Sequence, residues 1–294
     1  MNSRALTALL AAAALLPFCG TARADDEVVA VLSSAGGAYL EAFSAFQAEY
    51  GAAVPVLDAS AGTPRLPAGA RTVVAFGGKA ASLKYPPGLA LVYAIAPGAF
   101  IPSERGGARA VKIAMLPEFR LVLSRLKAIQ PGLERLTAFW MSPGFADYAQ
   151  SFVDTGAAVG IKVTPVRVKR QEDLPAMLRG GLKDMQAFWL PPDPLLISPE
   201  TLLIFREFSW NNGIPMYAST KGLAREGATA SVGISFAESG AAAARAVKAL
   251  NAGGAAPAVI FPTRTELTLN ATAAKKCGVT YSEEILREAD YLFP

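Results

Sequence analysis

Short apolar runs alternate with longer amphipathic segments along most of the chain. The first run, residues 28–32, is rich in β-branched residues and predicts a strand. In the next segment Phe43, Phe46 and Tyr50 recur at spacings of three and four residues, which predicts a helix. Further strands are expected at residues 53–57, 73–76, 89–95 and 111–115, and a helix at residues 117–129.

The same alternation begins again at Leu136. Ser198 followed by Pro199 is typical of a helix start, because serine caps the first turn and proline fits the first helical position. The second series of strands is expected at residues 136–141, 163–168, 186–190, 215–218 and 231–234. Its helices are expected at residues 144–159, 171–182, 198–212 and 236–250.

Strands that alternate with helices of this length predict an α/β fold of parallel sheets with helices on both faces. Two successive series predict two doubly wound, Rossmann-like lobes, with a seam near Pro131 and Gly132. Ligands of open parallel sheets lie beyond the carboxyl ends of the strands. We therefore expect a cleft between the lobes, lined by the loops that follow the strands.

The N-terminus has the pattern of an export signal. Arg4 precedes an apolar run at residues 6–18, and the small-x-small sequence at residues 22–24 is a cleavage site, so residues 1–24 are expected to be a removed signal peptide. The run is too short to cross a bilayer comfortably. Cys19 leaves open a lipid anchor, but Pro17 and Phe18 stand where small residues are usual, which favours release into the periplasm as a soluble protein.

The composition excludes several kinds of chemistry. The chain has 294 residues with no histidine and only two cysteines, which excludes histidine-based catalytic relays and histidine-based zinc sites. No dinucleotide fingerprint is present, and we expect neither enzymatic activity, nor a metal, nor a cofactor. Signal cleavage removes Arg4 and Arg23, which leaves 26 basic against 24 acidic residues and a net charge of +2, with no basic run that would bind nucleic acid. The remaining Cys277 is expected to be buried.

The second half carries a resemblance. Residues 186–193 (Gln-Ala-Phe-Trp-Leu-Pro-Pro-Asp), the stretch through Ser219, Arg-Glu-Gly-Ala at 225–228 and Leu-Thr-Leu-Asn at 267–270 resemble an ABC-transporter substrate-binding family with tryptophan- and tyrosine-binding members. The resemblance covers the chain from about Leu136 to its end. It implies a type I periplasmic binding protein fold with a hinge, a small organic solute such as an amino acid as ligand, and the membrane permease of an ABC transporter as partner.

The first half departs from the family pattern. Residues 58–71 are a short linker rich in Ala, Gly and Pro, where the family has a longer segment with a helix. We expect a reduced N-terminal lobe at residues 25–132, a C-terminal lobe at 133–235, and a segment at 236–294 that returns across the hinge, part of which joins the first lobe. The reduction keeps an alternative open: a degenerate relative that acts as a periplasmic sensor or scaffold for a receptor protein, without transport.

The candidate ligand-binding residues follow the predicted strands. Hydroxyls and backbone N–H groups before a helix suit a carboxylate, Lys79 suits an anion, and Asp193 suits an ammonium group. The complete set of candidates is Ser33, Ser34, Gly77, Gly78, Lys79, Ser142, Tyr148, Asp193, Tyr217 and Ser219.

Several candidates have a structural alternative. Ser33 and Ser34 also fit an ordinary turn, and Asp193 also fits a turn before a helix. Tyr148 fits the core equally well, and Lys79 fits a solvated helix surface. Trp140 and Trp189 lie inside predicted strands among apolar neighbours, so we expect them in the core rather than in contact with a ligand.

Overall fold

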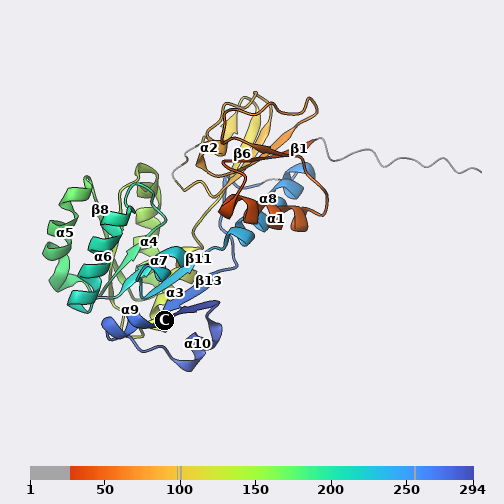
Figure 1. The fold of residues 1–294 in the computed structure, drawn as a ribbon. Helices are drawn as coiled ribbons and strands as arrows, with labels where there is room; N and C mark the ends of the chain where they lie inside the picture. The colour runs from red at the N-terminus through yellow and green to blue at the C-terminus, as the bar shows by residue number, and fades with distance from the viewer. Residues whose placement is uncertain (1–26, 98, 100, 255) are drawn as a thin grey trace, which may run out of the picture.

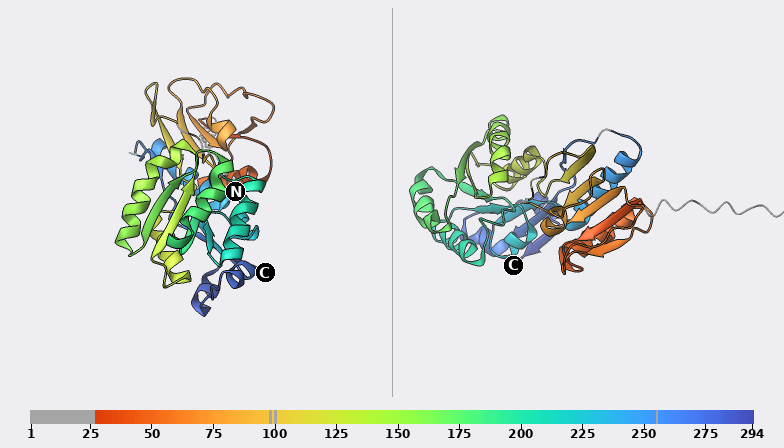
Figure 2. Two further views of the ribbon diagram at one scale, coloured as in Figure 1. Left: turned by 90° about the vertical axis from the view of Figure 1, so that its left-hand side faces the viewer. Right: turned by 90° about the horizontal axis from the view of Figure 1, so that it is seen from above.

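The strands form two separate sheets. The computed structural model describes residues 27–97, 99, 101–254 and 256–294, and within them each sheet has seven strands. Figure 1 shows the sheets and their helices as two bodies joined by several chain segments, and Figure 2 shows the two bodies side by side. The predicted signal peptide, with Cys19, lies outside the described residues. No helix in the described part of the chain is both long and apolar enough to cross a membrane.

The first sheet is parallel except for one short strand. Its order is β12 (Val259–Ile260), β6 (Ala108–Ile113), β4 (Ala90–Ala94), β3 (Thr72–Phe76), β1 (Val28–Leu32) and β2 (Val56–Asp58). The short strand β5 (Glu104–Arg105) pairs with β6 in the antiparallel direction. The parallel neighbours bring the carboxyl ends of β1, β3, β4 and β6 to one edge of the sheet.

Alternate residues of the first sheet face two different cores. Val28, Ala30 and Leu32 pack against the long helices α1 (Gly37–Tyr50) and α8 (Phe236–Asn251). Val29 and Val31 face the opposite side, which is covered by the short helix α2 (Gly78–Ala81) and by loops. Residues 59–71 contain no helix, as the short linker in the sequence predicts. The first lobe therefore has full helical cover on one face only.

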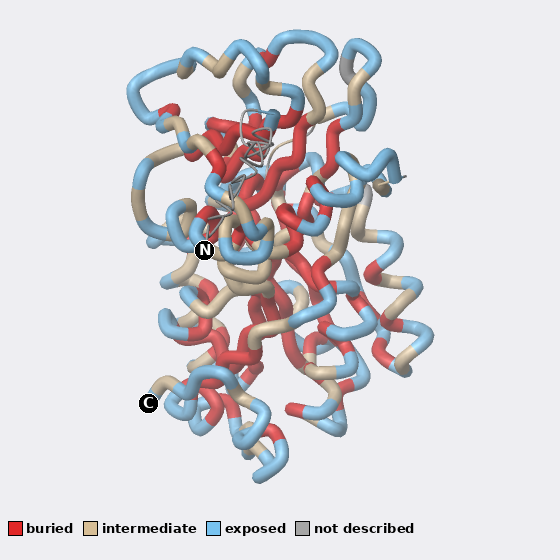
Figure 3. Tube along the Cα trace, turned by 90° about the vertical axis from the view of Figure 1, so that its right-hand side faces the viewer, coloured by how far each residue is buried: buried red, intermediate tan, exposed pale blue. Residues whose placement is uncertain are grey.

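The second sheet is covered by helices on both faces. Its order is β14 (Tyr291–Phe293), β13 (Glu266–Asn270), β11 (Ala230–Gly233), β10 (Met216–Ala218), β9 (Ala187–Leu190), β7 (Arg135–Trp140) and β8 (Lys162–Arg167). One face packs on α3 (Phe119–Ile129), α4 (Ala146–Ala158) and α10 (Glu283–Glu288). The other packs on α5 (Leu174–Gly181), α6 (Pro199–Asn212) and α7 (Lys221–Arg225), with α9 (Ala271–Lys276) against α6. Figure 3 shows the buried strands running through both bodies inside exposed helices and loops.

Strand β13 runs antiparallel to β11, although the alternation of strands and helices predicted parallel neighbours. The reason is the route of the chain. After β11 the chain leaves for α8 and β12 in the first lobe, and it returns through residues 261–265. It thus re-enters the second sheet from the edge at which β11 ended, so the next strand must run the opposite way.

The chain passes between the sheets at residues 114–118, 234–235 and 261–265. Helix α3 packs with the second sheet, whereas the seam expected at Pro131 and Gly132 assigns this helix to the first lobe. Its apolar stripe, which includes Val122, Leu123 and Leu126, is buried among residues of β7, β9 and β11. We propose residues 27–115 with 236–260 as the first lobe and the remaining described residues as the second.

Most predicted elements are confirmed with shifts of one to three residues at their ends. The cap of α6 is confirmed, because the Thr201 N–H donates to the Ser198 hydroxyl at 3.2 Å. Trp140, Trp189 and Cys277 are buried, as expected. The pattern did not predict the strands β5, β12, β13 and β14, nor the short helices α7, α9 and α10.

Helices α1 and α8 approach closely at one glycine. A Cβ at Gly240 would lie 1.9 Å from the backbone oxygen of Ala42, so no side chain fits there. We expect Gly240→Ala to lower the free energy of unfolding by about 2 kcal/mol or more, because the helices must separate. Urea unfolding measures this change.

The matched control is Gly180→Ala on α5, where a Cβ meets nothing within 4 Å. This substitution is expected to be neutral or stabilising by up to about 1 kcal/mol, the usual gain from replacing glycine in a helix. Equal effects of the two substitutions would contradict the close helix contact.

Candidate functional site

Two adjoining cavities lie between the lobes at the carboxyl ends of the strands. The outer cavity has a volume of about 880 Å³ and the inner one about 50 Å³, and Lys112, Ser142 and Tyr148 line both. The first lobe contributes the ends of β4 and β6, and the second lobe contributes the loops after β7 and β9. The inner cavity is lined by Pro97, Lys112, Ala114, Met115, Leu116, Ser142, Gly144, Phe145, Tyr148, Pro192, Asp193, Pro194 and Phe261.

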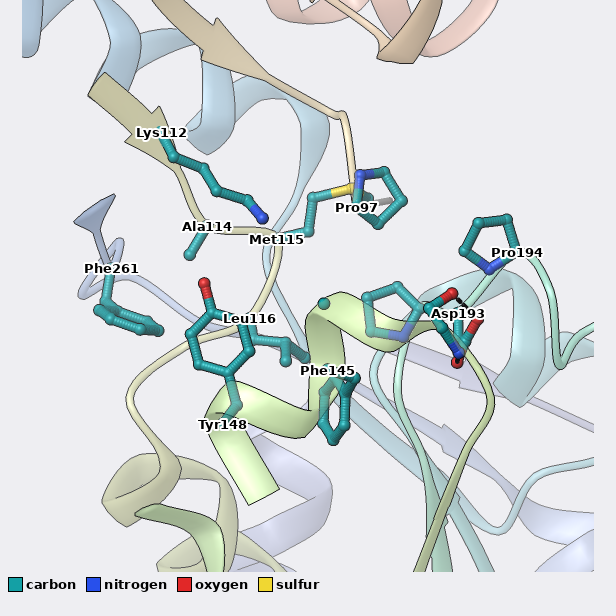
Figure 4. Close-up of a pocket in the computed structure, with 13 residues that line it drawn as sticks. Pro97, Lys112, Ala114, Met115, Leu116, Phe145, Tyr148, Asp193, Pro194 and Phe261 are labelled. Atoms are coloured by element: carbon teal, nitrogen blue, oxygen red, sulfur yellow. Dashed lines mark hydrogen bonds between the residues drawn. The ribbon is translucent and has the colours of Figure 1, made fainter. Parts of the chain in front are cut away.

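The carboxylate of Asp193 joins the two loops of the second lobe. One oxygen accepts the backbone N–H groups of Met141 at 2.7 Å and Ser142 at 2.8 Å. The other accepts the Ser142 hydroxyl and the N–H groups of Leu195 at 3.0 Å and Leu196 at 3.3 Å. The side chain thus ties the loop after β7 to the loop after β9 and fixes the wall of the cleft that both provide (Figure 4).

This carboxylate is buried, and N–H and O–H donors of the protein take the place of water around it. Asp193 is only 3% exposed. Burial raises the pKa of Asp193, but the hydrogen bonds from the Ser142 hydroxyl and from the N–H groups of Ser142, Met141 and Leu195 outweigh it and hold the pKa below its ordinary value. The charged form is therefore the stable one at neutral pH.

Among the described residues that line the cavities, the cationic one, Lys112, comes from the first lobe. Lys112, on β6, donates from Nζ to the backbone oxygen of Ala99 at 3.4 Å, and Nζ lies 5.9 Å from the centre of the Tyr148 ring. Figure 4 shows Lys112 and Tyr148 pointing toward each other from opposite sides of the cleft. Tyr93, on the neighbouring strand β4, lines the outer cavity, and burial together with the nearby Tyr148 raises the pKa of its hydroxyl.

Aromatic rings form much of the apolar wall. The ring of Tyr148 is 6.1 Å from that of Phe145 and 6.2 Å from that of Phe261, with the latter pair edge to face. Phe261 follows β12 in the segment that returns to the second lobe. The cleft is consequently built from all three parts of the chain: the first lobe, the second lobe and the returning segment.

Three of the predicted site residues come together in this cleft: Ser142, Tyr148 and Asp193. For Asp193, the structure shows the turn role that the sequence left as an alternative, because its oxygens accept hydrogen bonds from the loop itself. Ser142 serves the same contact. Tyr148 lines the cavities and also packs at the edge of the second core, a position that is compatible with either of its two expected roles.

Five others lie together at the ends of β1 and β3 but line neither cavity: Ser33, Ser34, Gly77, Gly78 and Lys79. The Ser33 hydroxyl accepts the N–H of Ala80 at 2.9 Å, and Lys79 donates to the backbone oxygen of Ser60 at 2.6 Å. Gly77 has a φ of 101°, and a Cβ there would lie 2.3 Å from the Ser33 hydroxyl oxygen. These contacts hold the loops of the first lobe together.

Tyr217 and Ser219 lie in the core rather than in the cleft. Tyr217 is 0% exposed and donates its hydroxyl to the Gln130 side chain at 2.9 Å, and burial raises its pKa far above the ordinary value. The Ser219 hydroxyl donates to the backbone oxygen of Leu190 at 3.2 Å. Tyr217 is on β10 and Ser219 directly follows this strand, which lies inside the second sheet, where neighbouring strands and helices cover it.

Lys112 and Phe261 are not among the site residues predicted from the sequence. A signal for Lys112 was available: it is the only charged residue in the apolar run 110–116, and a lysine in such a strand is unusual. Phe261 had no such signal, since only the return of the chain after β12 brings it to Tyr148.

Two doubly wound sheets, three connecting segments and a cavity at the strand ends define the architecture of a type I periplasmic binding protein. The family model for ABC transporter substrate binding proteins matches residues 120–292, more than half of the chain. The chain therefore belongs to this substrate-binding family, as the resemblance implied. No match was found among curated protein sequences.

Solved structures share the fold over nearly the whole chain. An ABC domain from Streptococcus pneumonia in complex with L-Trp has 17% identity and a TM-score of 0.62, covering 92% of this chain and 100% of that one. A conserved domain protein from Vibrio cholerae has 16% identity and a TM-score of 0.60, covering 91% and 100%. The ligand-free, open structure of a substrate binding protein with adhesive properties from Clostridium difficile has 14% identity and a TM-score of 0.64, covering 91% and 99%.

The hydrogen bonds to the Asp193 carboxylate are expected to make a pH-dependent contribution to the free energy of unfolding. A pKa lowered in the folded state contributes stability above the ordinary aspartate pKa of about 4, and this contribution is lost as the pH falls through the folded value. We expect Asp193→Asn to cost about 2 kcal/mol or more at pH 7, and the difference from the wild type to shrink below pH 4.

Urea unfolding at pH 7, 5 and 3 tests this expectation. Asp154→Asn, at an exposed position of α4, is the control and should change the free energy of unfolding by less than about 0.5 kcal/mol. If Asp193→Asn lowers the free energy of unfolding by the same amount at all three pH values, the charged carboxylate does not stabilise the fold in this way.

Proposed function

We propose that the chain is the periplasmic solute-binding protein of an ABC-type uptake system and holds a small organic solute between its lobes. One observation carries this proposal: both lobes line a cavity of about 880 Å³ at the strand ends, and Phe261 of the returning segment lines the smaller cavity that adjoins it. This volume lies in the range of sites for small molecules. Membership of a substrate-binding family supports the same role.

Binding would couple to closure of the lobes. A solute that contacts both lobes favours the arrangement in which they are closest, and hinge closure of this kind is a common response of two-lobed proteins. The segments 114–118, 234–235 and 261–265 are the places where the chain would bend. A membrane permease would then recognise the closed form. Membership of the substrate-binding family supports a permease as the partner.

We propose Ser142 and Tyr148 as contacts of the solute and Asp193 as the residue that positions their loops. Ser33, Ser34, Gly77, Gly78 and Lys79 lie at the same edge of the first sheet as the ends of β4 and β6. Closure would bring this edge toward the second lobe, so they remain proposed contacts of the closed form. Nothing in the positions of Tyr217 and Ser219 supports direct contact.

The alternative role, a sensor or scaffold partner without transport, draws on the reduced first lobe. Residues 59–71 contain no helix, and one face of the first sheet has only α2 as helical cover. Such a protein would not need to bind any solute. The binding experiment below therefore separates the two roles.

Export is part of the proposal. We expect the periplasmic protein to begin at Asp25, and Cys19→Ser to leave its export and its N-terminus unchanged. Cell fractionation and mass spectrometry of the N-terminal peptide measure both. A mature chain that begins at a lipid-modified Cys19 and stays with the membrane would overturn the soluble form.

Solute binding is tested on residues 25–294 with a thermal-shift panel of amino acids, aromatic acids and other small carboxylates. A solute at 100 times its dissociation constant is expected to stabilise the fold by about 2.7 kcal/mol. Gly144→Trp should abolish this shift, because Gly144 lines both cavities and a Cβ there meets nothing within 4 Å.

The matched control is Gly180→Trp, which adds the same side chain at an open position away from the cleft. It should leave the shift intact. Binding that survives Gly144→Trp would place the solute elsewhere. No thermal shift with any compound of the panel would favour the sensor role.

A further inference from the structure

Phe261 lies between two hollows of the molecule. Its ring lines the inner cavity between the lobes, and it also lines a groove of about 480 Å³ beside α3 and α4. Among the described residues, Tyr148 is the other one that lines both. These two rings therefore separate a solute in the cleft from the groove.

The rings form the inner end of the cleft. The ring centres of Phe261 and Tyr148 are 6.2 Å apart and edge to face, and Tyr148 meets Phe119 in the same way at 6.5 Å. Figure 4 shows Phe261 and Tyr148 at one end of the inner cavity and Pro194 at the other. Pro194 also lines the outer cavity, whereas Phe261 does not. The Phe261 ring is thus a wall at the end away from the outer cavity.

Phe261 differs from its two aromatic neighbours in how it is held. Phe119 is buried in the core of the second lobe, and Tyr148 packs against that core. Phe261 is half-buried on the connecting segment 261–265, and in the described part of the chain none of the four hydrophobic clusters includes it. The contacts of this large apolar side chain are therefore made at the cavities rather than in a core.

The groove behind Phe261 could hold part of a longer molecule. Phe119 and Tyr148 give it an aromatic surface, and Ser151 and Asp154 are among its polar lining residues. Without the Phe261 ring, the inner cavity would open toward this surface. An apolar chain that continued there would gain further contact, because each buried methylene tightens binding about fourfold.

We propose that Phe261 limits the length of the solute. The ring closes the inner end of the cleft, so the protein accepts compact solutes and rejects those whose apolar chain would continue into the groove beside α3 and α4. This inference rests on the proposed function, and it narrows the class of solute by size rather than by charge.

The test is isothermal titration calorimetry of residues 25–294 with the n-alcohols from 1-butanol to 1-decanol. Their hydroxyl group is uncharged, so the series changes the chain length alone. Each methylene that enters the cavity should tighten binding about fourfold. In the wild type we expect this gain to stop before 1-decanol, because the Phe261 ring ends the cavity.

Phe261→Ala should extend this limit by at least two methylenes. 1-Decanol should then bind the variant about tenfold or more tightly than the wild type, whereas 1-butanol should bind both about equally. Phe293→Ala, at a half-buried phenylalanine outside both hollows, is the control and should keep the wild-type limit. Thermal unfolding of each free variant shows whether it folds. If Phe261→Ala does not fold, Phe261→Leu replaces it in the same comparison.

The outcomes separate this inference from the proposed function. The same length limit in the wild type and in Phe261→Ala, or equally weakened binding of every alcohol to the variant, overturns the inference. No binding of any alcohol also overturns it, and solute binding then stands if the thermal-shift panel gives a shift that Gly144→Trp abolishes. No binding of any alcohol or of any compound of the panel overturns the proposed function and the inference together.

Discussion

The hydrogen bonds to the Asp193 carboxylate hold the cleft in its shape. A buried charge is stable only if donors replace its water, and here the donors come from two loops that are 51 residues apart in the sequence. The same contacts therefore satisfy the charge and fix the distance between the ends of β7 and β9. Tyr148 and Phe145 follow the first of these loops, so their positions depend on it.

The route of the chain sets the second constraint. Because the chain leaves the second sheet after β11 and returns to it as β13, three segments connect the lobes rather than one. Under the proposed function, these three connections are where the chain would bend as the lobes close. They also bring Phe261 from the returning segment to the ring of Tyr148. The topology thus places an aromatic residue at the cleft.

The sequence predicted much of the fold because each buried strand and amphipathic helix has its own periodicity. It could not predict the antiparallel β13 or the place of α3, since both depend on where the chain crosses between lobes. For the site, the position of a residue after a strand identified Ser142, Tyr148 and Asp193. The same rule also selected Tyr217 and Ser219, which neighbouring elements cover, and it passed over Lys112, which lies within a strand.

Hydrogen–deuterium exchange with and without a bound solute tests whether a small solute is held between the lobes. Slower exchange is expected in residues 112–116, 142–148 and 192–195, which form the facing walls of the cleft. Little change is expected in the outer helices of either lobe. Protection confined to one lobe, or located away from these three segments, would show that the solute is not held between the lobes.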